Sequence, residues 1–97
     1  MAVTRISRDA LDNLIGGKVK DNVTIVLKFY SNSCHLCHSL KDYYEDISEK
    51  EEYKDLYFFA YNIDDYPEIE SKLRFKGVPT IFVIHANIGN RLPKISL

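Results

Sequence analysis

The sequence predicts an α/β domain with a mixed sheet and helices on both faces. Apolar segments rich in β-branched and aromatic residues predict buried strands, and stretches with apolar residues every three or four positions lie between them. Strands that alternate with helices pair in parallel through right-handed crossovers, and a closing hairpin adds an antiparallel pair. The expected order is αβαβαββ, in a single domain over residues 1–97.

The first half of the chain predicts a helix, a strand and a second, longer helix. Ser7 can cap a short helix that runs to about Ile15, where two glycines end it. Val23–Tyr30 is almost continuously apolar, which is typical of a strand buried on both faces. Residues 34–50 then change to helical spacing, with apolar positions at Leu36, Leu40, Tyr44 and Ile47.

The second half predicts two more buried strands and an edge strand. The buried strands are expected at Leu56–Ile63 and Thr80–Ile84, with a helix between them that begins at Asp64–Pro67 and runs to about Phe75. Asn87–Asn90 can turn the chain into a polar strand near Arg91–Leu97. Pro93 favours an edge position for that strand, because proline has no backbone N–H to donate.

Composition narrows the class of protein and the compartment. Hydrophobic residues make up 45% of the 97 and charged residues 28%, and the net charge is −1. We therefore expect no general attraction to nucleic acid or to an anionic membrane, and no apolar run is long enough to cross a bilayer. Charges interrupt the first nine residues before an apolar segment forms, which argues against a secretory signal and for a cytoplasmic protein.

The only two cysteines form the motif Cys34-His35-Leu36-Cys37, and His38 follows it. Two thiols at this spacing suit reversible dithiol–disulfide chemistry. The same residues also match the C-x-x-C-H attachment motif of c-type haem, and they offer ligands to zinc. The haem hypothesis is disfavoured because the motif follows a buried strand, and the zinc hypothesis because no second ligand pair occurs elsewhere.

The predicted helix assigns different roles to the two thiols. Cys34 lies at the helix N-terminus, where unpaired backbone N–H groups and the helix dipole favour a thiolate, so it is the expected nucleophile. Cys37 lies one turn further on and is the expected resolving thiol. His35 can favour the Cys34 thiolate further when it is protonated, whereas His38 is expected to be an exposed residue without a specific task.

The segment Lys76-Gly77-Val78-Pro79-Thr80, together with the cysteine motif, resembles the thioredoxin family. Ala60–Asp64 followed by Pro67 also matches, and the resemblance covers about residues 23–84. It implies a thioredoxin-like fold in which Pro79 is cis and the backbone of Val78 pairs with an extended substrate beside Cys34. It also implies a disulfide oxidoreductase that serves in electron transport.

Three departures from the family stand out. The chain has no tryptophan, and His35-Leu36 replaces the usual Gly-Pro, which predicts a more oxidising protein than thioredoxin. Lys28 stands where thioredoxins keep a buried aspartate, and Ala60 replaces the lysine that accompanies it. Lys28 is expected either to reach water with its ammonium group or to act on Cys37, by lowering the pKa of that thiol or, when neutral, by accepting its proton.

The third departure is that no helix is expected after the last strand, which would leave part of one sheet face uncovered near Ile81 and Val83. The function we expect is thiol exchange between Cys34–Cys37 and protein disulfides, with no metal or other cofactor. The expected reductant is a thioredoxin reductase or glutathione. The alternative is a non-catalytic interaction module or subunit with the same fold.

Overall fold

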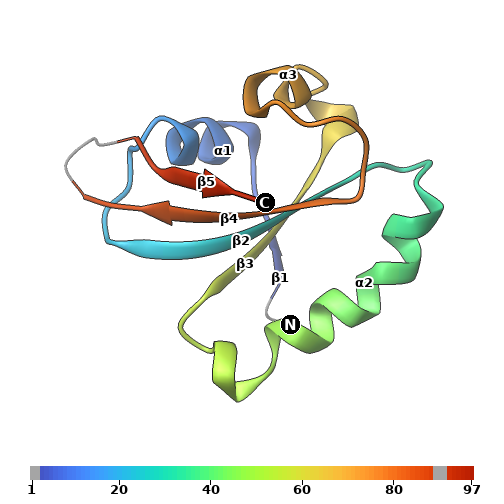
Figure 1. Ribbon diagram of the computed structural model, residues 1–97, viewed down its shortest axis with the longest axis horizontal. Coiled ribbons are helices and arrows are strands. Elements are labelled where there is room, and N and C mark those ends of the chain that lie inside the picture. The colour runs from blue at the N-terminus through green and yellow to red at the C-terminus, as the bar shows by residue number, and fades with distance from the viewer. Residues whose placement is uncertain (1–2, 89–91) are drawn as a thin grey trace.

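The computed structural model describes residues 3–88 and 92–97. Over these residues the chain forms strands and α-helices in alternation, with two short 3₁₀ helices, η1 and η2 (Figure 1). In chain order the elements are β1 (Val3–Arg5), α1 (Arg8–Ile15), β2 (Val23–Tyr30), α2 (His35–Ser48), η1 (Glu51–Tyr53), β3 (Tyr57–Asn62), η2 (Ile63–Asp65), α3 (Ile69–Leu73), β4 (Thr80–Ala86) and β5 (Lys94–Ser96).

The five strands form one mixed sheet in the order β1-β3-β2-β4-β5. β3 pairs in parallel with both β1 and β2, whereas β4 runs antiparallel to β2 and to β5. The central strand β2 has the predicted bounds, and β5 lies at the edge, directly after Pro93. The predicted thioredoxin-like α/β fold is therefore confirmed, including the antiparallel closing hairpin. The expected turn at Asn87–Asn90 lies partly outside the described residues.

Two details of the predicted order are wrong. The sheet has an additional strand, β1, which precedes the first helix and pairs through Val3 with Phe58. The predicted helix from Asp64 begins only at Ile69, after a 3₁₀ turn. Tyr66 interrupts the helix with φ −159° and ψ 67°, because the ring of the following Pro67 disfavours the helical region for the residue before it.

α1 and α3 cover one face of the sheet, and this face holds the main core (Figure 1). Phe29 is fully buried at its centre, stacks on Phe75 with ring centroids 4.9 Å apart, and meets Phe82 edge to face. Ser7 caps α1 as predicted, by accepting a hydrogen bond from the N–H of Ala10. The other core residues on this face include Leu11, Leu14, Ile25, Leu27, Tyr61, Tyr66, Ile69, Ile84 and Ala86.

α2 covers the opposite face over β3 and β2 (Figure 1), and its packing there is more polar. Tyr44 bridges the two strands, with its hydroxyl 2.9 Å from the Val26 carbonyl and 2.8 Å from the Phe59 carbonyl. Its single proton can serve only one carbonyl at a time. Burial raises the pKa of Tyr44, so the hydroxyl remains protonated as a donor at neutral pH.

Among the described residues, no helix packs on the β4–β5 part of this face. Ile81 is 39% exposed there, and Val83 is half-buried. β5 contributes polar residues on this side, because its register pairs Ser96 with Val83 and Lys94 with His85. The uncovered face is thus only partly apolar.

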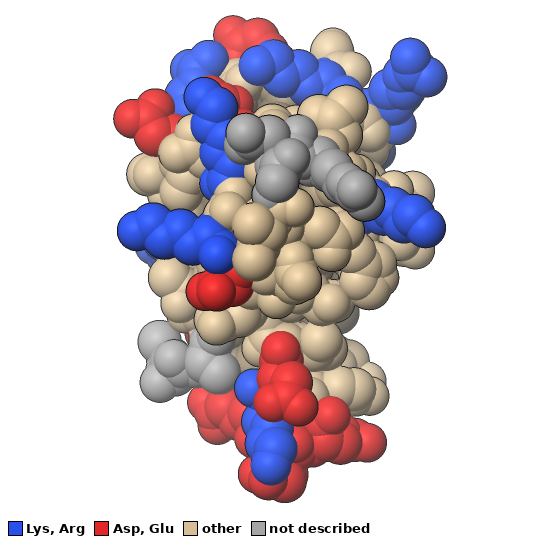
Figure 2. Space-filling model, turned by 90° about the vertical axis from the view of Figure 1, so that its left-hand side faces the viewer, with Lys and Arg blue, Asp and Glu red and all other residues tan. Residues whose placement is uncertain are grey.

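Acidic side chains gather at the end of the molecule that η1 and the last turn of α2 form (Figure 2). Those exposed there include Asp46, Glu49, Glu51, Glu52 and Asp55, and Glu51 pairs with Lys54 at 3.1 Å.

Within the described residues, no helix has the length and apolar character needed to cross a membrane.

Candidate redox site

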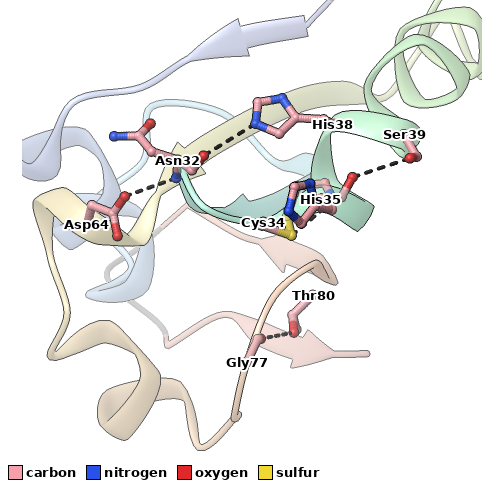
Figure 3. The surroundings of a disulfide bond; sticks show 9 residues. Asn32, Cys34, His35, His38, Ser39, Asp64, Gly77 and Thr80 are labelled. Atoms are coloured by element: carbon pink, nitrogen blue, oxygen red, sulfur yellow. Dashed lines mark hydrogen bonds between the residues drawn. A yellow bond between two sulfur atoms is a disulfide. The ribbon is translucent and has the colours of Figure 1, made fainter.

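The Cys34 and Cys37 sulfurs are joined in a disulfide at the start of α2 (Figure 3). Their Cα atoms are 5.2 Å apart, and the separation of three residues is the one-turn spacing expected from the sequence. The structure therefore shows the oxidised form of the pair.

Cys34 is the N-cap residue of α2, as expected for the nucleophile. Its backbone is extended, and its sulfur accepts a hydrogen bond from the Cys37 N–H at 3.0 Å. After reduction the same N–H would stabilise a Cys34 thiolate, because hydrogen bonds to the charged form of a group favour that form.

The two cysteines differ in exposure in the direction that their expected roles require. Cys34 is partly exposed, whereas Cys37 is only 4% exposed. A substrate disulfide can therefore reach Cys34 from solvent, and Cys37 is better placed to attack Cys34 than to attack a substrate.

The Val78–Pro79 peptide bond is cis, the isomer that the family resemblance implies. The sheet register pairs Thr80, at the start of β4, with Phe29, near the end of β2. Val78 and Pro79 therefore lie at the same end of the sheet from which the chain leaves β2 toward Cys34, and Figure 3 draws Gly77 and Thr80 among the surroundings of the disulfide. Their expected role in substrate binding stays a prediction.

A polar network, which the sequence pattern does not predict, holds the loop before Cys34. The Asn32 N–H donates to the Asp64 carboxylate at 3.0 Å (Figure 3). The Asn62 amide donates to the Asn32 side-chain oxygen at 2.9 Å. His38 is exposed, but its Nε2 lies 3.4 Å from the Asn32 carbonyl and donates to it when it carries the proton. The family-like segment at the end of β3 was the available signal, since it contains Asn62 and Asp64.

His35 is the first residue of α2 and is exposed. Its side chain lies beside Cys34 in Figure 3, and within the described residues no hydrogen bond fixes its ring. Its proposed effect on the Cys34 thiolate therefore rests on proximity alone.

No group of three or more His, Cys, Asp or Glu side chains suited to a metal ion occurs within residues 3–88 and 92–97.

Lys28 is buried on β2 beneath α2, with only 5% of its surface exposed. Its register partner on β3 is Ala60, so the two positions at which the chain departs from the family are neighbours. The ammonium nitrogen lies 4.6 Å from the centroid of the Tyr44 ring. Burial lowers the pKa of Lys28; Lys41 and Arg5 lower it further, and Glu45 opposes them.

Replacing Lys28 with methionine is expected to stabilise the protein at neutral pH, because methionine occupies the site without burying a charge. Folding lowers the pKa of Lys28, so the unfolded chain binds more protons than the folded protein between that lowered pKa and 10.5. The free energy of unfolding of the wild-type protein therefore rises with pH through this interval. The amount by which the free energy of unfolding of Lys28→Met exceeds it shrinks accordingly. Urea unfolding at several pH values tests this, and an advantage independent of pH would contradict it.

A model of the thioredoxin family matches residues 6–92, which include the disulfide, Lys28 and Pro79. The chain belongs to the thioredoxin family. Among curated proteins, the sequence finds no match.

Solved structures of this family share the fold. The Trx4 domain of ERdj5 superposes with a TM-score of 0.79 at 14% identity, over 98% of this chain and 80% of that one. Thioredoxin from Trypanosoma brucei brucei gives a TM-score of 0.70 at 21% identity, over 98% of this chain and 77% of that one. Thioredoxin f2, solved in complex with ferredoxin:thioredoxin reductase, gives a TM-score of 0.73 at 22% identity, over 98% of this chain and 81% of that one.

Proposed function

We propose that this thioredoxin-family protein exchanges its Cys34–Cys37 pair with the disulfides of other proteins. The observation that carries the proposal is the disulfide itself, with a half-exposed Cys34 capping α2 and a buried Cys37 one turn later. An exposed nucleophile and a sheltered resolving thiol are the two parts that disulfide exchange requires.

In the reductive direction, the Cys34 thiolate attacks one sulfur of the substrate disulfide. A mixed disulfide forms, and the other substrate sulfur leaves as a thiolate and takes up a proton. Cys37 then loses its proton and attacks the Cys34 sulfur, which releases the second substrate thiolate. The substrate gains two electrons and two protons, and the protein is left with the Cys34–Cys37 disulfide.

A thiol reductant must restore the dithiol for each further turnover. A thioredoxin reductase or glutathione fits this requirement, and thioredoxin f2, a protein of the same fold, has been solved with a reductase bound. We propose the cytoplasm as the compartment, because a reducing environment keeps such a pair available for exchange.

The reduction of insulin by dithiothreitol tests the proposal. The wild-type protein is expected to accelerate insulin precipitation well above the rate with dithiothreitol alone, and the Cys34→Ser protein is expected not to. Equal rates with the two proteins would overturn the proposal and leave a non-catalytic interaction module as the alternative.

We predict a reduction potential above the value of about −270 mV that is typical of thioredoxin. A protonated His35 beside Cys34 would favour the thiolate and so stabilise the reduced form, which makes the pair more oxidising. Equilibration with glutathione buffers measures the potential, and His35→Ala should lower it. His85→Ala is the control, because His85 lies beside Thr24 at the opposite end of β2 from the disulfide. A wild-type potential at or below about −270 mV, or no change in His35→Ala, would contradict the prediction.

A further inference from the structure

A pocket of about 440 Å³ lies between α2 and the sheet, and Cys37 forms part of its wall. β1 contributes Arg5 to the lining, β2 contributes Lys28, and α2 contributes Lys41 and Glu45. The proposed exchange reaction assigns no role to this space. Its volume is within the range of sites that hold small molecules.

The charged side chains around the pocket do not balance. Arg5, Lys28 and Lys41 are cationic, and Glu45 is the only carboxylate in the lining. Within residues 3–88 and 92–97, none of these three cations forms an ion pair with a carboxylate. Three positive groups from three separate elements therefore face one cavity, with a single negative group to offset them.

Lys28 is the most unusual of the three, because its side chain is about as buried as the hydrophobic core. An ammonium group has three protons to donate, and burying it without acceptors is costly. Within the described residues, its ammonium makes no hydrogen bond to the protein and lies 4.6 Å from the centroid of the Tyr44 ring and 5.9 Å from that of the Tyr30 ring. Because no buried side-chain nitrogen or oxygen of the described residues is left without a partner, the ammonium is open to the pocket, where water or a bound ligand can accept its protons.

We propose that this pocket binds a small oxoanion of the phosphate class, held by Lys28 with help from Arg5 and Lys41. The oxygens of such an anion would accept the protons of the buried ammonium, and its charge would offset the excess of cations. The negative charge of a bound anion would raise the pKa of Lys28 and so oppose the burial that lowers it. Free phosphate and a phosphorylated small molecule share this chemistry.

Isothermal titration of the oxidised protein with inorganic phosphate and with phosphoserine, at constant ionic strength, tests the site. Saturable one-to-one binding of either probe is expected, and the tighter probe identifies the source of the anion. Lys28→Met should abolish binding, and Lys41→Gln should weaken it by about three- to tenfold. Lys50→Gln is the matched control, because Lys50 is exposed just beyond α2 and outside the pocket, and it should bind as wild type does.

Absence of saturable binding by both probes would overturn the proposal, and so would equal affinity in Lys28→Met or Lys41→Gln. Lys41 is exposed on the surface of α2, so its replacement leaves the fold intact and gives a test that does not depend on Lys28.

A second measurement locates the anion beside Cys37. In the Cys34→Ser protein Cys37 is the only thiol, and iodoacetamide alkylates it through its thiolate. An anion in the pocket would disfavour that thiolate, so phosphate is expected to slow alkylation at constant ionic strength. The same addition should leave the Cys34→Ser/Lys28→Met protein unaffected. An unchanged rate in Cys34→Ser at saturating phosphate would overturn the assignment to this pocket.

Discussion

Replacing Cys37 with serine is expected to arrest the protein as a covalent mixed disulfide with its substrate. Cys34 keeps its position at the N-terminus of α2, and the backbone N–H of residue 37 that bonds to its sulfur is retained. The attack by Cys34 therefore proceeds. The following step loses its intramolecular thiol, and we expect release of the substrate to slow by more than about a hundredfold, since positioned groups within one molecule have very high effective concentrations.

Non-reducing electrophoresis and intact mass spectrometry detect the adduct directly. The Cys37→Ser protein should carry one substrate chain and release one thiol per protein, where the reduced wild type releases two. The Cys34→Ser protein is the control and should form no adduct, because its remaining thiol is only 4% exposed. An adduct formed through Cys37 in that control would reverse the roles assigned to the two cysteines.

The elements that sequence predicts well are those with a strong local pattern. β2 has the bounds that its continuous apolar run indicates, and α2 begins directly after Cys34. β1 was missed because its residues carry almost no hydrophobic signal, and two of its three side chains are exposed. Only its pairing with β3 makes it a strand, and that partner lies more than fifty residues away.

The candidate site likewise has one part that the sequence predicts and one part that it does not. The spacing of Cys34 and Cys37 reveals the disulfide, since both ends lie within one helical turn. The cationic pocket has no such signature, because Arg5, Lys28 and Lys41 come from three elements that meet only in the folded sheet. The sequence shows Lys28 as a charge within an apolar strand, but only the tertiary structure shows which side chains surround it.

The two faces of the sheet differ in how much stability they contribute, and Phe29 tests the stronger one. Its side chain is fully buried against the rings of Phe75, Phe82 and Tyr61, and α1 and α3 pack over the same face. Phe29→Ala is expected to lower the free energy of unfolding by about 3–5 kcal/mol, because it removes a large apolar contact and leaves a cavity. This loss is a large fraction of the roughly 5–15 kcal/mol that stabilises a typical domain.

Urea unfolding measured by circular dichroism gives this free energy, and two variants serve as comparisons. Phe29→Leu retains most of the buried volume and should cost less than Phe29→Ala. Ile81→Ala removes a side chain from the open face, where it is 39% exposed, and should cost under about 1 kcal/mol. The open face is partly polar, so we expect it to contribute less to stability than the core beneath α1 and α3. A similar loss of unfolding free energy in Ile81→Ala and Phe29→Ala would contradict this expectation.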